Sequence, residues 1–353
     1  MSGRLPLTAR AADAIIDRGV LPDPVLRAAI RRLLRRRLVA EDPGTAAGRA
    51  AQKAARLEQW SHAPVALSTD EANEQHYEVP TELFELMLGP RLKYSSAYWT
   101  DGVSTLARAE DAMLALTCER ADLRDGQDVL ELGCGWGSLT LWMAERYPRS
   151  TITAVSNSST QRALIEKRAA ERGLDNVTVV TRDVNDLDTA PASVDRVVSV
   201  EMFEHVRNHA ELLRRIAGWL RPDGELFVHV FAHRELLYPF DVGGDGDWMA
   251  RHFFTDGVMP SHDLFLHLQE DLVVDRVWAV DGMHYSRTLE AWLDRLDASR
   301  DRVLQLLADT YGADRAEAWF HRWRVFTIAC SELFATKGGT EWHVTHTRMR
   351  RRR

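Results

Sequence analysis

The sequence predicts an α/β fold, a doubly wound parallel sheet with helices on both faces. From residue 127 onward, short apolar runs alternate with helical segments, and strands that alternate with helices form parallel sheets covered on both sides. A glycine cluster also stands directly between the first of these runs and an amphipathic helix. The 353 residues, with 45% apolar composition, suffice to bury one large core or two smaller ones.

The first 65 residues predict a helical N-terminal extension. They place apolar and charged residues at helical spacing, with a break at "EDPGTAAG", and they contain no catalytic motif. Their basic stretch "RRLLRRR" and the terminal "RMRRRR" contrast with a net charge of -7, which argues against general binding of nucleic acids. We interpret both stretches as solvated, and contact with a membrane surface or an acidic partner is the alternative.

The remaining residues, 66–353, predict one domain built on the sheet. The expected strands are "DVLELG", "TITAVS", "VTVVTRD", "DRVVSVE" and "GELFVHVF", followed late in the chain by "LVVDRVWAV" and "EWHVTHT". One helical insertion, at about residues 236–262, contains the loop "DVGGDGDW", and a second insertion of two helices spans about 288–334. Late insertions of this kind build a cap over the carboxyl edge of the strands, where doubly wound folds bind ligands.

No stretch has the character of a signal peptide or a membrane span, because no window approaches roughly 18 uninterrupted apolar residues. We therefore expect a cytoplasmic protein without integral membrane association. Cys118, Cys134 and Cys330 are too few and too scattered for a disulfide framework or a paired-cysteine zinc site. Reduced thiols and no metal are expected.

The segment "VLELGCGWGSLTLWMAERYP" predicts a ligand-binding turn. Gly133 and Gly135 let the backbone turn sharply and approach a ligand in front of the following helix, residues 138–147. Alone, such a turn fits a dinucleotide or no ligand at all. The acidic Glu131, together with the wording "E-L-G-C-G-W-G", resembles the first motif of S-adenosylmethionine methyltransferases.

Two further residues stand where a nucleoside would be held at the strand ends. The second strand ends at Ser156 and is followed by "NSSTQ", and the third ends in "RDV". Gln161 and Asp183 are therefore expected to face the ribose and the adenine, respectively. Alternatively, Gln161 is a helix-surface residue and Asp183 a helix cap.

A longer set of motifs resembles the cyclopropane-fatty-acid-synthase-like methyltransferases, and is most similar to their coclaurine N-methyltransferase branch. Besides the glycine turn, the motifs are "NEQHYEVPTELFELMLGPRLKYSSAYW", "AVSNSSTQ", "SVEMFEHVRN", "DWMARHFFTDGVMPS", "HYSRTLEAWLDRLD" and "EWHVTH", from about residue 70 to the end. The resemblance implies a Rossmann-like methyltransferase sheet of class I, with S-adenosylmethionine as methyl donor. The implied cofactor contacts are Tyr94 and Ser95 at the methionine part, Gly133 and Gly135 along the cofactor, Ser156, Asn157 and Gln161 at the ribose, and Asp183 and Val184 beside adenine.

Two departures separate the chain from the lipid-modifying members of that family. Where those enzymes read "YSCAY", this chain reads "YSSAYW", so Ser96 replaces a cysteine that forms a bicarbonate site with the matches of Glu204, His229 and Tyr285. They also carry a small residue where this chain has Glu201, whereas the amine methyltransferases read "E-x-F-E-H", as here. Both departures favour an amine acceptor over cyclopropanation.

Methyl transfer to an amine requires a free lone pair on the nitrogen. An alkyl amine with a pKa near ~10 is protonated at neutral pH, and removing that proton costs about 4 kcal/mol. Glu201, Glu204 and His205 are spaced i, i+3 and i+4, which on a helical turn faces all three to one side at the end of the fourth strand. We expect the carboxylates to attract the ammonium and Glu204 or His205 to accept its proton. The alternative is a solvated helix start.

Secondary candidates surround this set. His229, His233, His284 and Tyr285 are candidates for the same edge, and Trp248, Phe253, Phe254, Trp278 and Trp323 either box an ammonium substrate or belong to the core.

The leading interpretation is an N-methyltransferase for a small amine, such as a cyclic or aromatic secondary amine of tetrahydroisoquinoline type. The alternatives are a lipid enzyme that methylates or cyclopropanates acyl chains, with the basic N-terminal helix as its membrane-surface anchor, and a cofactor-binding regulatory module without activity. No nucleic-acid partner is expected. A homodimer is compatible with the sequence, which does not fix the oligomeric state.

Overall fold

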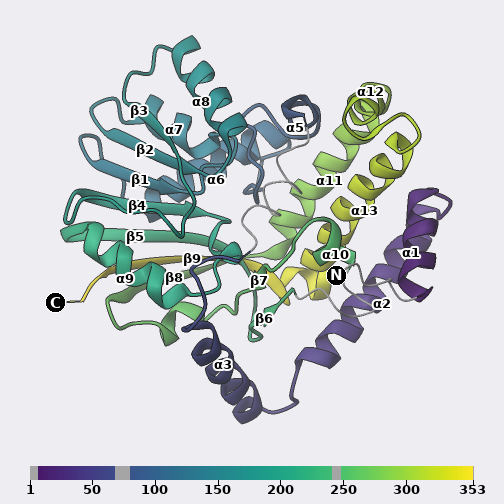
Figure 1. Ribbon diagram of the computed structural model, residues 1–353, viewed down its shortest axis with the longest axis horizontal. Coiled ribbons are helices and arrows are strands. Elements are labelled where there is room, and N and C mark those ends of the chain that lie inside the picture. Colours follow the sequence, from purple (N-terminus) through teal and green to yellow (C-terminus); the bar gives the residue numbers. More distant parts are fainter. Residues whose placement is uncertain (1–6, 68–79, 241–247, 353) are drawn as a thin grey trace.

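A computed structural model describes residues 7–67, 80–240 and 248–352, with the side chains of residues 7–10 excepted. Its main element is a seven-stranded sheet of order β3-β2-β1-β4-β5-β9-β8 (Figure 1). The strands are β1 (Asp128–Leu132), β2 (Thr151–Ser156), β3 (Val177–Thr181), β4 (Val194–Val200), β5 (Leu220–His233), β8 (Leu272–Val280) and β9 (Trp342–Arg351).

Strand directions confirm the doubly wound fold and add one feature that the sequence did not predict. β1 to β5 pair in parallel, as expected, whereas β9 runs antiparallel to β5 on one side and to β8 on the other. An apolar run shows that a strand is buried but not which way it runs. The sheet is therefore mixed, with its parallel part in the first half of the domain.

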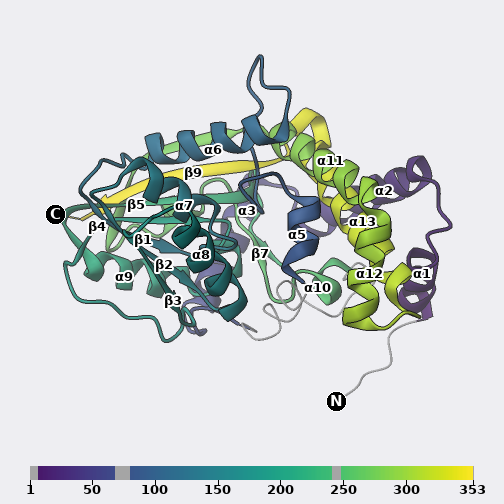
Figure 2. The ribbon, with the colours of Figure 1, turned by 90° about the horizontal axis from the view of Figure 1, so that it is seen from above.

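Helices cover both faces of the sheet, as predicted. α6 (Leu106–Arg120), α7 (Ser138–Arg146) and α8 (Ser159–Glu171) pack on one face, and α9 (His209–Trp219) packs on the other (Figure 2). Along β1, Val129 faces the first group and Leu130 faces the second, which is the alternation of a strand buried on both sides.

The N-terminal extension consists of three helices, α1 (Leu7–Asp17), α2 (Asp23–Glu41) and α3 (Ala46–Trp60). The expected break at "EDPGTAAG" falls between α2 and α3, where the Thr45 hydroxyl accepts a hydrogen bond from the Gly48 amide at 3.0 Å and caps α3. α2 lies against the C-terminal helices, since the Arg27 guanidinium pairs with Glu290 at 2.7 Å and Glu332 at 3.1 Å.

Three helices, not the two expected over residues 288–334, form a layer beside the carboxyl edge of the sheet (Figure 1). They are α11 (Gly282–Ala298), α12 (Arg300–Tyr311) and α13 (Ala316–Phe334). Ser299 both ends α11 and begins α12, so the chain changes direction without a glycine or proline to mark the break. With α5 (Thr81–Met87), these helices enclose an aromatic core around Trp292 and Trp323.

The other expected insertion, residues 236–262, is mostly not helical where it is described. It contains the short ribbon of β6 (Tyr238–Pro239) and β7 (Val258–Met259) and one five-residue helix, α10 (Trp248–His252). The glycine-rich loop at 241–247 lies outside the described residues, as do residues 73–79 of the first family motif.

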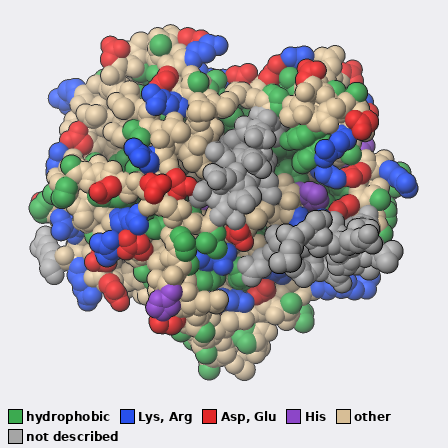
Figure 3. All heavy atoms as spheres, viewed as in Figure 1, with side chains coloured by type: hydrophobic (Ala, Val, Ile, Leu, Met, Phe, Trp, Pro, Cys, Tyr) green, Lys and Arg blue, Asp and Glu red, His purple; other side chains and the backbone are tan. Residues whose placement is uncertain are grey.

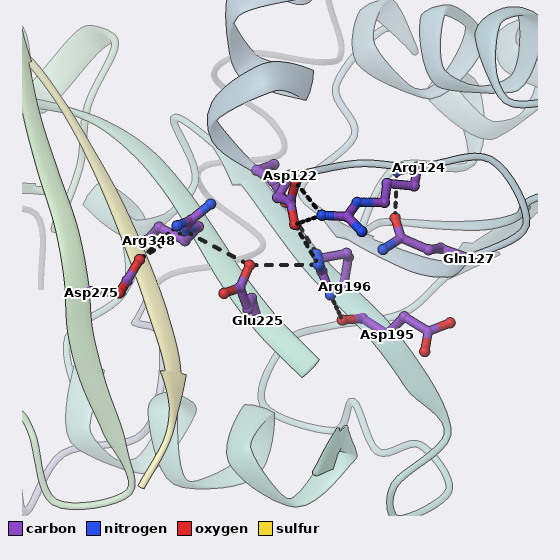
Figure 4. A network of polar contacts seen from close by, with 9 residues as sticks. Asp122, Arg124, Gln127, Asp195, Arg196, Glu225, Asp275 and Arg348 are labelled. Carbon is purple, nitrogen blue, oxygen red and sulfur yellow. Dashed lines mark hydrogen bonds and ion pairs between the residues drawn. The ribbon is translucent and has the colours of Figure 1, made fainter. Parts of the chain in front are cut away.

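An ionic network ties α6 to the mixed half of the sheet (Figure 4). Arg196 of β4 pairs with Asp122, which follows α6, at 3.2 Å and with Glu225 of β5 at 3.6 Å. Arg348 of β9 pairs with the same Glu225 at 3.7 Å and with Asp275 of β8 at 2.6 Å. Charges of alternating sign thus link four neighbouring strands to the residue that follows the end of α6.

Figure 3 shows charges of both signs interspersed over one face of the molecule. Exposed charges also pair with one another, as Arg302 does with Glu82 at 2.6 Å. Within the described part of the chain, no helix combines the length and the apolar character that crossing a lipid bilayer requires.

Candidate active site

A cavity of about 300 Å³ opens at the carboxyl edge of β1, β2 and β4, between the sheet and the layer of α11 and α13. One end is lined by the turns that follow the parallel strands, and the other by aromatic and aliphatic side chains. Every residue expected at the cofactor lines it: Tyr94, Ser95, Gly133, Gly135, Ser156, Asn157, Gln161, Asp183 and Val184.

The glycine turn after β1 lines this cavity. Gly133 and Gly135 have φ of 78° and 51°, in the left-handed region that favours glycine. A Cβ at Gly133 would stand 2.6 Å from the Cβ of Met202, whereas a Cβ at Gly135 would meet nothing within 4 Å. Because Gly135 also lines the cavity, a side chain there would occupy ligand space.

Polar groups at this end fit the nucleoside and amino-acid parts of S-adenosylmethionine. The Ser156 hydroxyl donates to the side-chain oxygen of Gln161 at 2.6 Å, which leaves the buried Gln161 amide nitrogen without a hydrogen-bond partner among the described residues. Burial raises the pKa of Glu131 to about 8, although its carboxyl accepts a hydrogen bond from Thr140 at 2.5 Å. Both groups border the cavity and could serve a ligand's hydroxyl and ammonium groups. The same described residues contain no cluster of His, Cys, Asp and Glu suited to a metal ion.

Glu201 is held by three hydrogen-bond donors from three parts of the chain. Its Oε1 accepts from the Ser96 amide at 3.0 Å and from His229 Nε2 at 3.1 Å, and its Oε2 accepts from the Tyr285 hydroxyl at 2.6 Å. A carboxylate accepts from all three donors, whereas a protonated carboxyl would lose one of these acceptor positions. The carboxyl group is therefore oriented toward the cavity that it lines.

A buried cation compensates the charge of Glu201. Burial raises the pKa of Glu201, and the Lys93 ammonium opposes that rise. Lys93 is only 2% exposed, and burial lowers its pKa to about 8 while Glu201 and Glu110 hold it up. Its ammonium donates to the Ser95 hydroxyl. Sequence reasoning missed Lys93, although it directly precedes Tyr94 in the family motif.

The expectation that Glu201, Glu204 and His205 face one side of a helical turn is wrong. The helical turn is a single 3-10 turn, Phe203–His205, and Glu201 precedes it with φ of 50° while its amide donates to the carbonyl of His229 at 2.8 Å. The chain leaves β4 so sharply that Glu201 adopts the left-handed region, which disrupts the helical spacing.

Glu204 and His205 consequently occupy different environments. Glu204 does not line the cavity: its Oε1 accepts from the Phe231 amide at 2.7 Å, and its Oε2 has no hydrogen-bond partner among the described residues. Burial, with the charge of Glu201, raises the pKa of Glu204 well above its ordinary value. His205 does line the cavity, with its ring 4.8 Å from that of Phe254.

Of the secondary candidates, one lines the cavity and the others do not. Tyr285 lines the cavity, whereas His229 lies behind Glu201 and burial lowers its pKa well below the ordinary value. His233 pairs with Glu341 at 3.3 Å, and His284 Nδ1 accepts from the Trp99 amide at 3.0 Å, so both serve other contacts.

Of the five aromatic residues expected as core or cation box, only Phe254 lines the cavity. Phe253 and Trp323 are core, and Trp278 lies under the Arg120 guanidinium, which is 5.1 Å from its ring. The aromatic wall instead consists of Trp136, Phe231, Phe240, Phe254, Trp292, Phe326 and Phe334. These residues come from the sheet edge, the 240–254 segment and the C-terminal helices, so no local sequence pattern joins them.

Comparison with known proteins gives concordant matches. The family model described as mycolic acid cyclopropane synthetase matches residues 67–343. The chain is 37% identical over 335 residues to (S)-coclaurine N-methyltransferase of Thalictrum flavum subsp. glaucum, covering 94% of this chain and 92% of that protein. It is 32% identical over 277 residues to the cyclopropane-fatty-acyl-phospholipid synthase of Escherichia coli (strain K12), covering 78% and 67%. A solved coclaurine N-methyltransferase bound to N-methylheliamine and SAH superposes with a TM-score of 0.93 at 35% identity, covering 97% and 99%.

Proposed function

Because this chain belongs to the mycolic acid cyclopropane synthetase family, we propose that it is an S-adenosylmethionine-dependent N-methyltransferase that acts on a small amine. Its sheet is that of the class I methyltransferases, and its match to coclaurine N-methyltransferases covers more of the chain than its match to the cyclopropane synthase. The family supplies the enzyme class. The choice between an amine and a lipid acceptor comes from the site.

The carboxylate of Glu201 is the observation that carries this choice. It takes up the Ser96 amide, the imidazole of His229 and the hydroxyl of Tyr285, which are donors suited to an oxyanion such as bicarbonate. The resemblance implies that lipid enzymes of the family bind bicarbonate with the matches of these residues and have a small residue at position 201. Here a built-in carboxylate satisfies the donors, so no bicarbonate is needed and an anion faces the incoming substrate.

The roles in amine methylation follow from position and charge. When bound, S-adenosylmethionine supplies an electrophilic methyl group on its sulfonium. Glu201 attracts and orients the protonated amine, because its charge is fixed by three donors in a buried site. His205, whose side chain lines the cavity, is in place to accept the ammonium proton. Glu204 is buried outside the cavity lining, where its carboxyl accepts a hydrogen bond from the Phe231 amide at 2.7 Å. Glu204 therefore has no direct contact with the substrate, and any part in proton transfer would run through a relay.

The aromatic end of the cavity supports a flat or cyclic amine. Phe254 and Phe231 stand near each other, with ring centroids 5.7 Å apart, and Phe334 stacks on Tyr285 at 4.3 Å. Tyr285 also binds Glu201, so one side chain joins the apolar wall to the anionic end. A tetrahydroisoquinoline presents the same two parts, a planar ring and a secondary amine, and we propose this class as substrate.

We add three proposals, on the domain organisation, the cellular location and the oligomeric state. Residues 66–353 act as the methyltransferase domain, with residues 1–65 as an extension held to it by the Arg27 ion pairs. A cytoplasmic location is supported by the free thiols of Cys118, Cys134 and Cys330. The third proposal is a homodimer, and analytical ultracentrifugation would test it.

The test is to incubate the purified protein with S-adenosylmethionine and a mixture of cyclic amines, linear amines and monounsaturated phospholipids, and to identify products by mass spectrometry. We expect mass increases of one methyl group on cyclic or aromatic secondary amines, absent without S-adenosylmethionine. Modified phospholipid as the main product would overturn the proposal and support the lipid enzyme.

A further inference from the structure

We propose that Arg120 and His346, neither of which reaches the cavity, are positioning residues that fix the imidazole of His229 as a hydrogen-bond donor to Glu201. The structure connects these four side chains in one row. Arg120 NH1 lies 2.8 Å from His346 Nδ1, His346 Nε2 lies 2.9 Å from His229 Nδ1, and His229 Nε2 lies 3.1 Å from Glu201 Oε1.

The fold places the two imidazoles side by side. His229 of β5 and His346 of β9 are directly opposite in the antiparallel pairing, and their ring centroids are 4.6 Å apart. Trp278 is the partner of His346 on β8, and the Arg120 guanidinium lies over its ring. Arg120 is the last residue of α6, and its guanidinium reaches His346 of β9 at 2.8 Å. The row therefore starts at a helix end and crosses two strands to reach the site.

Hydrogen-bond polarity runs in one direction along this row. A guanidinium only donates, so His346 Nδ1 must be the acceptor and its proton must lie on Nε2. His346 Nε2–H then donates to His229 Nδ1, which places the remaining proton of His229 on Nε2, facing Glu201. One permanent cation thus determines the tautomers of two imidazoles. Without it, either ring could carry its proton on the other nitrogen.

Both rings must be neutral for this polarity to hold, and their surroundings keep them so. His229 and His346 are fully buried. Burial lowers the pKa of each ring well below its ordinary value, and the charges of Lys93 and Arg120 lower it further. The row therefore transmits orientation, while the positive charge stays on Arg120.

Arg120 is suited to this part because its guanidinium, which lies over the Trp278 ring, keeps its N–H donors for His346. Among the described residues it forms no ion pair with a carboxylate, in contrast to Arg196 and Arg348 on the same face of the sheet. The network of Figure 4 anchors the chain next to it, since Arg196 binds both Asp122 and the carbonyl of Ala121, the latter at 3.2 Å. The end of α6 is fixed, and Arg120 is directed toward His346.

The consequence for Glu201 is a preference for the carboxylate form. An N–H on His229 stabilises a carboxylate, whereas a bare nitrogen at the same place would favour a protonated carboxyl. Losing the donor therefore raises the pKa of Glu201. The other groups that face Glu201 are Lys93, the Ser96 amide, Glu204, Tyr285 and Cys330, and variants of Arg120 leave all of them in place.

The first experiment observes the tautomers directly by imidazole ¹⁵N NMR, with His229→Gln and His346→Gln used for assignment. In the wild-type protein we expect Nε2–H for both rings. Arg120→Met removes the donor and should yield a mixture or the Nδ1–H form, whereas Arg120→Lys keeps a donor and should preserve Nε2–H. The matched control is Arg124→Met, which removes an arginine 73% exposed at the same end of α6. Nδ1–H in the wild type, or tautomers unchanged in Arg120→Met, would overturn the proposal.

The second experiment rests on the proposed function and measures kcat/KM for amine methylation against pH. Arg120→Met should move the acid limb upward by about 1 pH unit, a roughly tenfold loss on its acid side, with recovery at higher pH. In the Glu201→Gln background the same change should have no further effect, because Arg120 acts through that carboxylate. Additive losses, or a pH-independent loss, would indicate a general structural role and overturn the inference. Should no amine be methylated at all, the proposed function fails while the NMR result still decides the tautomers.

Discussion

Glu201→Gln separates the charge of Glu201 from its shape. The amide oxygen can keep the two hydrogen bonds of Oε1, from the Ser96 amide and His229 Nε2. The amide nitrogen replaces Oε2 and can donate to the Tyr285 hydroxyl, which is able to accept as well as donate. The substitution therefore preserves the local geometry and removes a negative charge.

The size of the effect follows from Coulomb's law. An ammonium about 4 Å from a carboxylate gains about 4 kcal/mol at an effective dielectric of about 20. Lys93 already compensates part of that charge, and after the substitution it faces the ammonium without its counter-ion. We therefore expect about half of the Coulomb value, an increase in KM of roughly 10- to 100-fold for a strongly basic amine, with kcat changed by less than about threefold.

The assay compares a strongly basic cyclic amine with a weakly basic aromatic amine, which arrives uncharged. Only the basic amine should show the increase in KM, and S-adenosylmethionine affinity by calorimetry and the melting temperature should stay near wild type. Equal KM values for wild type and variant on the basic amine would refute the role of Glu201 as an anion for the substrate.

Three further predictions concern the cofactor, the proton and stability. Gly135→Val should abolish S-adenosylmethionine binding, as measured by calorimetry. The control is Gly126→Val, at another glycine of positive φ with open space around it, which should leave binding intact. Equal effects of the two substitutions would mean that backbone strain is responsible. His205→Ala should lower kcat by about 10²- to 10⁴-fold at pH 7 and by less at pH 9, where free amine is available, and a loss independent of pH would exclude proton acceptance. Burial raises the pKa of Glu131 from 4.5 to about 8, so the ligand-free protein should lose stability as the pH rises between these two values. Glu131→Gln should make the melting temperature less dependent on pH in this range. A pH dependence that persists in the variant would show that other groups cause it.

Most of the fold could be predicted because the parallel strands are buried on both faces and therefore read as continuous apolar runs. The runs ending at Leu132, Ser156 and Val200 all became strands of the sheet. The antiparallel direction of β9 was not predictable, since the burial of a strand does not depend on the direction in which it runs. The break at Ser299 was also hidden, because α11 ends and α12 begins there without a glycine, a proline or a side-chain cap from Ser299.

Only part of the candidate site could be predicted from the sequence. Residues in turns directly after strands, such as Gly135 and Asn157, could be placed because parallel strands end at one edge. The side-chain directions of Glu201 and Glu204 could not, because helical spacing presupposes a helix and Glu201 has φ of 50°. Arg120 and His346 are 226 residues apart, and nothing local in either segment indicates that they meet.

We propose that Glu201 replaces an external oxyanion and thereby makes the enzyme specific for amine acceptors. The most direct test measures initial rates of methyl transfer to a tetrahydroisoquinoline amine and to a monounsaturated phospholipid, in buffers freed of carbonate and then titrated with bicarbonate. We expect N-methylation of the amine at a rate independent of bicarbonate, and no product from the phospholipid. Cyclopropanated or methylated phospholipid whose rate of formation rises with bicarbonate would contradict it.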